Sequence, residues 1–190
     1  MEELKEKILR EGVAIGTETV KVDRFLNHML DMRLLEKIGA RLAESFSQCR
    51  IDKILTVESS GIAVACMTSR YLGYPPVVFA KKAQPSTMTE GFFQAGARSF
   101  TKGTLSMLRV SEKLLSPGES ILIIDDFLAH GEASSALTDI VSQAGGRVAG
   151  IGAVIEKGFQ GGGKRLREKG YRVESLAVIE KIENGRIFFS

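Results

Sequence analysis

The chain has 190 residues, of which 44% are hydrophobic and 26% are charged, and its formal net charge is +3. This composition is typical of one globular domain with a full core, and the small charge does not indicate a nucleic-acid-binding protein, although it suits anionic small ligands. The sequence shows neither a signal-peptide pattern at its start nor an apolar run of membrane-spanning length. Cys49 and Cys66 form no C-x-x-C motif and are predicted to be reduced, as in a cytoplasmic protein.

The first third of the chain predicts a small region of local structure ahead of a buried strand. An amphipathic helix is expected over residues 2–11, followed by two short strands around Gly16. Asp31 is a suitable N-cap for a second helix, whose apolar residues recur at 3.6-residue spacing. That helix leads to residues 53–57, which read as a strand buried on both faces.

Small and basic residues follow the next two predicted strands. The strand at 53–57 is followed by a turn and a helix over 62–72, and the turn contains Ser59, Ser60 and Gly61. Hydroxyl groups and backbone amides at a helix N-terminus can bind an anion, although an ordinary strand–helix connection with a serine cap is the alternative. The strand at 77–80 ends in two cations, Lys81 and Lys82, which could neutralise a diphosphate or form a solvated turn.

A long polar connection separates these strands from the second half of the chain. It covers residues 83–107, and the stretch 98–104 within it predicts the turn of a hairpin that leads into a strand at 105–110. Connections of this length inside a compact domain usually form lids or binding loops. We therefore expect a flexible loop here that closes over a ligand.

A strand, two acids, a loop and a helix come next, and they dominate the sequence. Ile121–Ile124 predicts a strand buried on both faces, ended by Asp125 and Asp126. A loop of small residues follows, in which Gly131 permits a positive φ, and a helix begins near Glu132. Ligands of open α/β sheets bind beyond the carboxyl ends of the strands, and helix N-termini bind phosphate. A phosphate about one sugar away from two carboxylates describes a ribose 5-phosphate, whereas solvated acids at a strand end are the alternative.

The remaining residues complete an α/β pattern within a single domain, residues 1–190. Strands are expected at 147–155 and 173–179, with a short helix at 164–169 between them. Asn184-Gly185 predicts a type I′ hairpin turn into the last strand, residues 187–189. The run 158–165 matches G-x-x-x-x-G-K but has arginine where a nucleotide-binding loop needs serine or threonine, so a flexible loop is favoured. The two histidines are isolated and predict no metal site.

Residues 119–133 resemble the signature of the type I phosphoribosyltransferases. The resemblance implies a central, mostly parallel sheet flanked by helices, a long flexible loop, and a small hood formed by about residues 1–30 and the C-terminal segment. It implies that Asp125 and Asp126 hold the ribose hydroxyls of phosphoribosyl diphosphate (PRPP). The implied 5-phosphate site is Ala129, His130, Gly131, Glu132 and Ala133. The implied diphosphate site is Ser59, Ser60, Gly61, Lys81 and Lys82.

Five further segments resemble bacterial xanthine phosphoribosyltransferases, namely residues 12–28, 56–63, 99–102, 150–160 and 170–177. The resemblance implies that a cytoplasmic homodimer converts xanthine and PRPP into xanthosine 5′-monophosphate and diphosphate, without nucleic-acid or membrane partners. It implies Mg²⁺ held mainly by the substrate, with help from Asp125 and Asp126. The implied xanthine contacts are Val20, Asn27 and Lys157, and Asn27 is expected to read the 2-oxo group. His130 departs from the family pattern, where asparagine is expected.

Two alternatives remain open at this point. The enzyme could act on another purine, as hypoxanthine–guanine and adenine phosphoribosyltransferases do. A non-enzymatic, PRPP-sensing regulator would need a DNA-binding module, but roughly 50 residues precede the first core strand and they contain no clustered basic helix. Turnover with a panel of bases discriminates among these functions.

Overall fold

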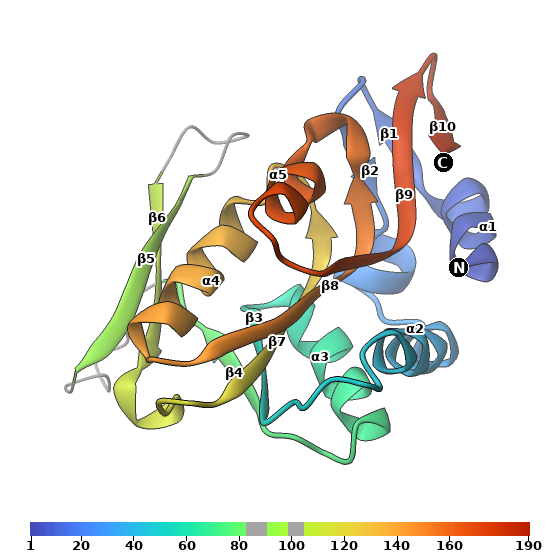
Figure 1. The fold of residues 1–190 in the computed structure, drawn as a ribbon. Coiled ribbons are helices and arrows are strands. Elements are labelled where there is room, and N and C mark those ends of the chain that lie inside the picture. The colour runs from blue at the N-terminus through green and yellow to red at the C-terminus, as the bar shows by residue number, and fades with distance from the viewer. Residues whose placement is uncertain (83–90, 99–104) are drawn as a thin grey trace.

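The computed structural model describes residues 1–82, 91–98 and 105–190. A six-stranded sheet in the order β10-β9-β8-β7-β3-β4 forms its centre (Figure 1). All neighbouring strands are parallel except β9 and β10, which are antiparallel. The strands are β3 (Lys53–Val57), β4 (Val77–Ala80), β7 (Ser120–Leu128), β8 (Arg147–Lys157), β9 (Val173–Glu183) and β10 (Arg186–Phe189). The prediction of a mostly parallel sheet is therefore confirmed.

Successive side chains of each strand point to opposite faces of this sheet. Helices cover both faces. Leu122 and Ile124 of β7 lie in one hydrophobic core with α2 and α3, whereas Ile121 and Ile123 lie in a second core with α4. The antiparallel hairpin β5–β6 packs against α4 (Figure 1). The elements around the sheet are α2 (Met32–Ser45), α3 (Ser60–Tyr71), β5 (Phe92–Arg98), β6 (Leu105–Ser111), η2 (Glu112–Leu114), α4 (Glu132–Gln143), η3 (Gly158–Gln160) and α5 (Gly162–Glu168).

The central strand β7 is longer than the sequence predicted. Asp125 and Asp126 do not end it, because β7 continues to Leu128 in parallel register with β8. Its pairing with β3 stops earlier, at Ile123. Beyond that point one edge of β7 is no longer paired with a neighbouring strand, so the acid pair sits where the sheet opens.

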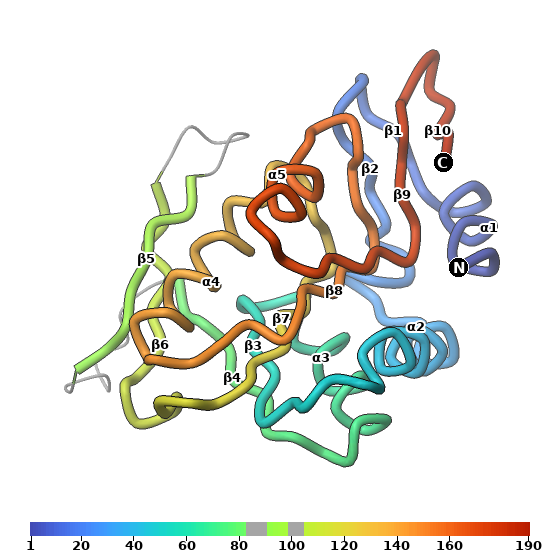
Figure 2. Tube along the Cα trace, in the orientation of Figure 1, coloured from blue at the N-terminus to red at the C-terminus, as the bar shows by residue number. Residues whose placement is uncertain are grey.

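The two ends of the chain lie beside each other at one side of the sheet (Figure 2). The ammonium group of Lys5 donates to the main-chain oxygen of Ser190 at 2.9 Å, and the amino terminus donates to the oxygen of Leu176 in β9. The N-terminal elements are α1 (Glu2–Glu11), the antiparallel pair β1 (Val13–Ile15) and β2 (Thr19–Lys21), and η1 (Asp23–Asn27). The π-helical turn η1 buries Phe25 and Leu26.

Several local predictions are confirmed by backbone geometry. Asp31 caps α2, since its side chain accepts a hydrogen bond from the amide of Leu34 at 3.2 Å. Asn184 and Gly185 both have positive φ, 49° and 73°, as a type I′ turn requires. Gly131 has φ of 74°, which places it in the left-handed region that glycine adopts without strain.

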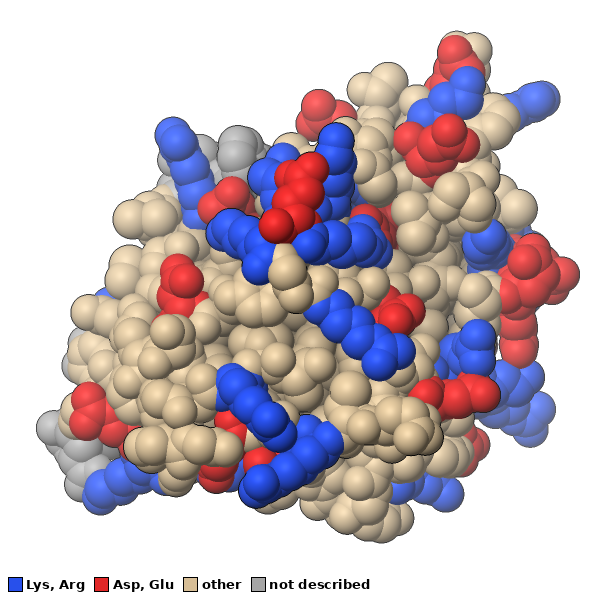
Figure 3. All heavy atoms as spheres, viewed as in Figure 1, with Lys and Arg blue, Asp and Glu red and all other residues tan. Residues whose placement is uncertain are grey.

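The predicted lid is only partly described, since residues 83–90 and 99–104 lie outside the described residues. Its described part, residues 91–98 and 105–107, contains β5, which was not predicted, and the first residues of β6. On the face drawn in Figure 3, lysine and arginine side chains gather over α5 but acidic side chains lie among them. Within the described residues, no helix is long and apolar enough to cross a membrane.

Candidate active site

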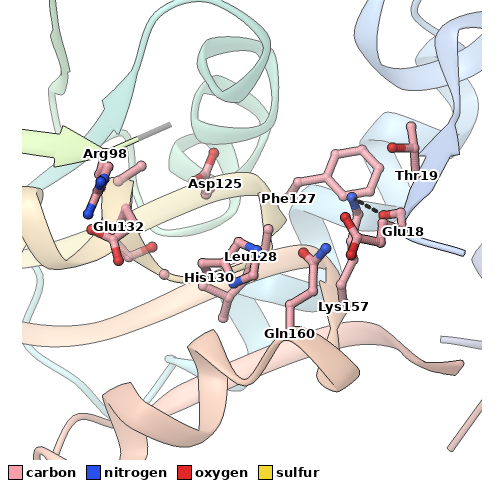
Figure 4. A pocket seen from close by; sticks show the side chains of 14 residues that line it. Glu18, Thr19, Arg98, Asp125, Phe127, Leu128, His130, Glu132, Lys157 and Gln160 are labelled. Carbon is pink, nitrogen blue, oxygen red and sulfur yellow. Dashed lines mark hydrogen bonds between the residues drawn. The ribbon is translucent and has the colours of Figure 1, made fainter. Parts of the chain in front are cut away.

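Two adjoining pockets share Asp125, Arg98, Glu132 and Ala133 in their walls. The first has a volume of about 240 Å³ and is lined by residues from β7, α4, the end of β8 and the β1–β2 turn (Figure 4). The second has a volume of about 390 Å³ and is lined by residues after β3 and β4 and by the β5–β6 hairpin. This position at the carboxyl ends of parallel strands is where open α/β sheets bind ligands.

Asp125 lines both pockets, whereas Asp126 lines only the second. Asp125 and Asp126 are 9% and 7% exposed, and the amide of Asp126 donates to Asp125 Oδ1 at 3.0 Å. Burial and the neighbouring charge of Asp126 hold the pKa of Asp125 well above its ordinary value. A ligand that donates hydrogen bonds or carries positive charge would therefore relieve unfavourable electrostatics at this point.

The loop after β7 is braced from behind by the start of α5. The amide of Gly162 donates to the oxygen of Ala129 at 3.1 Å, and Arg165 donates to the oxygen of His130 at 2.8 Å. A Cβ atom on Gly162 would lie 2.3 Å from the oxygen of Ala129, so only glycine allows this approach. The predicted phosphate-binding residues, 129–133, all line the first pocket.

Ser134 also lines the first pocket, although the sequence analysis did not single it out. Its side chain is 1% exposed, and its hydroxyl oxygen has no hydrogen-bond partner among the described residues. A serine in the first turn of a helix is common, so the sequence offered no signal that distinguishes this one. Its unpartnered hydroxyl can donate to an anion held at the N-terminus of α4.

Two of the five residues predicted to bind diphosphate line the second pocket, and the other three lie elsewhere. Ser60 and Lys82 line the second pocket beside the acid pair. Ser59 is exposed at the N-cap of α3 and makes no side-chain capping bond, and Gly61 is buried against Thr56, where an added Cβ would lie 2.2 Å from the hydroxyl oxygen. Lys81 lines a separate groove, so its contact with diphosphate, like those of Ser59 and Gly61, stays a prediction.

The predicted base contacts differ in how they meet the first pocket. Lys157 lines it, and it is the last residue of β8 rather than a residue beyond the strand. Its ammonium donates to the main-chain oxygen of Glu18 at 2.8 Å and lies 5.6 Å from the centroid of the Phe127 ring. Burial lowers the pKa of Lys157, with the charge of Glu18 acting against that shift. Lys157 thus joins β8 to the β1–β2 turn over the pocket.

Asn27 and Val20 are not among the residues that line the first pocket. The amide nitrogen of Asn27 donates to Asp126 Oδ2 at 2.5 Å, which ties η1 to the acid pair. Val20 is buried in the hydrophobic core, whereas its neighbours Glu18 and Thr19 line the pocket. The roles of Asn27 and Val20 in binding a base therefore stay predictions.

Six residues that line the first pocket were missed besides Ser134, namely Glu18, Thr19, Arg98, Phe127, Leu128 and Gln160. Phe127 had a usable signal, because it lies two residues after Asp125 in a strand and so shares its face. Arg98 was noted only as the start of a hairpin turn. Gln160 follows β8 in the single turn η3, where a glutamine has no distinctive sequence pattern.

The phosphoribosyl transferase domain family matches residues 22–183. The chain belongs to the phosphoribosyltransferase family. This phosphoribosyltransferase is 51% identical over its full length to the xanthine phosphoribosyltransferase of Laribacter hongkongensis and 47% identical to that of Clostridioides difficile, each covered completely. The solved adenine phosphoribosyltransferase of Rhodothermus marinus shares the fold, with a TM-score of 0.74 and 22% identity over 94% of this chain and all of the other.

Proposed function

We propose that the protein transfers the 5-phosphoribosyl group of PRPP to xanthine, giving xanthosine 5′-monophosphate and diphosphate in purine salvage. The observation that carries this proposal is that one pocket joins the buried Asp125 of the acid pair, the N-terminus of α4 and the half-buried Lys157. The full-length relatives named xanthine phosphoribosyltransferase support the choice of base.

The residues act mainly by positioning and by charge stabilisation. Backbone amides of residues 129–133 and the hydroxyl of Ser134 hold the 5-phosphate at the N-terminus of α4, and the acid pair accepts hydrogen bonds from the ribose hydroxyls. Ser60 and Lys82 face the second pocket, where they stabilise the leaving diphosphate. The base in the first pocket is then held in line with the sugar, which lowers the entropic part of the barrier.

Mg²⁺ suits the acid pair, because carboxylate oxygens are hard ligands and a dication would offset the burial of two neighbouring acids. No cluster of three histidine, cysteine or acidic side chains suited to a metal occurs in the described residues. Substrate oxygens would therefore complete its coordination, together with Asp125 and Asp126. When bound there, the ion supplies neutralisation of the diphosphate charge.

A cytoplasmic homodimer is part of the same proposal, with PRPP and xanthine as its partners. The two cysteines of the described chain are free, which is compatible with a reducing compartment. Light scattering or analytical ultracentrifugation of the purified protein measures the oligomeric state, and a mass near one chain would exclude the dimer.

Turnover with PRPP and Mg²⁺ against xanthine, guanine, hypoxanthine, adenine and orotate in turn tests the function directly. We expect the highest kcat/KM with xanthine, and diphosphate as the second product. A higher kcat/KM with another base would replace xanthine as the substrate. Binding of PRPP without turnover of any base would favour a regulator.

Asn27 provides a test of how the 2-position of the base is read. An amide nitrogen carries two N–H groups, and one of them already donates to Asp126, so the second can donate to the 2-oxo group of xanthine. We expect Asn27→Ala to narrow the preference for xanthine over hypoxanthine by roughly tenfold, or about 1.4 kcal/mol. The ratio of the two kcat/KM values is the measurement, because any common effect through Asp126 cancels. An unchanged ratio would remove Asn27 from base recognition.

Ser134 provides a test of the phosphate site. We expect Ser134→Ala to raise the KM for PRPP by about ten- to a hundredfold, since a hydrogen bond to a charged group contributes about 1.5–3 kcal/mol. The KM for the base should change little. Ser135→Ala is the matched control, because the neighbouring serine does not line the pocket. Equal KM values for PRPP in both variants would show that Ser134 does not contact the phosphate.

A further inference from the structure

The side-chain oxygen of Gln160 is buried in the wall of the first pocket and has no hydrogen-bond partner among the described residues. A buried acceptor without a donor costs free energy, so most such groups in folded proteins are paired. Gln160 and Lys157 both line this pocket, and Figure 4 draws the two side chains there. The oxygen is therefore placed to accept a hydrogen bond from a ligand rather than from the protein.

Gln160 is held in this position by its main chain. It is the last residue of η3, whose turn is closed by the amide of Gly161 donating to the oxygen of Gly158 at 3.0 Å. Arg165 donates to the main-chain oxygen of Gln160 at 3.4 Å and to that of His130 at 2.8 Å, so the turn is fixed to the phosphate loop. The main chain of Gln160 is therefore fixed relative to the phosphate loop, and its side-chain oxygen is buried in the pocket wall.

Lys157 and Gln160 offer opposite hydrogen-bonding groups to a base in this pocket. Lys157 presents an N–H donor, and Gln160 presents an acceptor three residues later. Xanthine, hypoxanthine and guanine carry an oxygen at position 6 beside an N–H at position 1. Adenine carries the reverse pattern, an amino donor at position 6 beside an acceptor nitrogen at position 1. A site that presents a donor to position 6 and an acceptor to position 1 therefore matches the first three bases and disfavours adenine.

We propose that Gln160 is a specificity-determining residue whose side-chain oxygen accepts the N1–H of an oxopurine while Lys157 donates to its 6-oxo group. This inference rests on the proposed function and extends it, because it names the residue that excludes 6-aminopurines. Asn27 would read the 2-position separately. With adenine bound in the same orientation, the oxygen of Gln160 would face the lone pair of N1 and the ammonium of Lys157 would face the amino group.

The test compares Gln160→Leu with Gln160→Glu, which keeps an acceptor oxygen at the same distance along the side chain. Each variant is measured for kcat/KM with xanthine and hypoxanthine, and for inhibition by adenine and by 1-methylxanthine, which has no N1–H. We expect Gln160→Leu to lower kcat/KM for xanthine and hypoxanthine by about tenfold. The inhibition constants of adenine and of 1-methylxanthine should stay the same or fall. Gln160→Glu should retain more of the preference for an N1–H than Gln160→Leu does. The KM for PRPP should stay near that of the wild type.

Four outcomes would overturn the inference. An equal loss for every base, or a raised KM for PRPP with unchanged base selectivity, would assign Gln160 to the phosphate loop. Retention of the wild-type ratio between xanthine and 1-methylxanthine in Gln160→Leu would show that N1–H is not read here. A wild-type protein that turns over no oxopurine would overturn the proposed function as well, whereas the first results leave that function intact. The midpoint of thermal unfolding identifies a variant that fails to fold.

Discussion

Replacement of both Asp125 and Asp126 by asparagine is expected to leave the protein folded and to remove most of its turnover. Each charge-assisted hydrogen bond to a ribose hydroxyl contributes about 1.5–3 kcal/mol, so the double variant should lose roughly 10²- to 10⁴-fold in kcat/KM. Steady-state kinetics with PRPP and xanthine measures this loss. Asp139→Asn is the matched control, because Asp139 is an exposed acid on α4 that does not line either pocket.

Replacement of Asp125 should preserve or raise the stability of the folded protein, although it removes turnover. Burial and the charge of Asp126 raise the pKa of Asp125 in the folded state. A carboxyl whose folded pKa is raised makes the protein lose stability as the pH rises from the unfolded pKa through the folded pKa. Asp125→Asn removes that loss, so its thermal midpoint near pH 7 should equal or exceed that of the wild type.

Turnover within twofold of the wild type, in a folded double variant, would refute the ribose-binding role of the pair.

Replacement of Arg167 by methionine should destabilise the fold. Glu156 is 3% exposed and accepts two hydrogen bonds from Arg167, at 3.0 and 2.9 Å, and one from Ser175 at 2.5 Å. Removal of Arg167 leaves this buried carboxylate without its cation. Because the Arg167 side chain is 43% exposed, we expect a loss of about 2–3 kcal/mol in the free energy of unfolding, below that of a fully buried pair.

The pH dependence of stability provides a second measurement of this cluster. Burial raises the pKa of Glu156, but the hydrogen bonds from Arg167 and Ser175 outweigh it and hold the pKa below its ordinary value. Its contribution is therefore present above the unfolded pKa of about 4.3 and is lost as the pH falls through the folded pKa. Arg167→Met should weaken this dependence in urea unfolding experiments.

Lys164→Met is the matched control for Arg167→Met. Lys164 lies on the same helix, and its ion pair with Glu168 is exposed and 3.9 Å long. Such a pair contributes little, so the variant should change the free energy of unfolding by less than about 0.5 kcal/mol. Equal losses in the two variants would show that the pair of Arg167 and Glu156 does not stabilise α5 against the sheet.

The sequence by itself determined most of the local structure and the chemical character of the site. Hydrophobic periodicity, the cap at Asp31 and the turn at Asn184-Gly185 were sufficient, because these signals act between residues that are close in the chain. The run from Asp125 to the loop at 129–133 was also readable, since strand, acids, loop and helix start are contiguous.

Only the tertiary structure decided where β7 ends and which polar side chains face the pockets. β7 extends past the acids because β8 continues beside it. Lys82 lines the second pocket, whereas its neighbour Lys81 lines a separate groove. Ser134 and Gln160 became candidates only through burial without a partner. Strand pairing and burial depend on elements that are distant in sequence, and no local pattern encodes which neighbour will cover a given side chain.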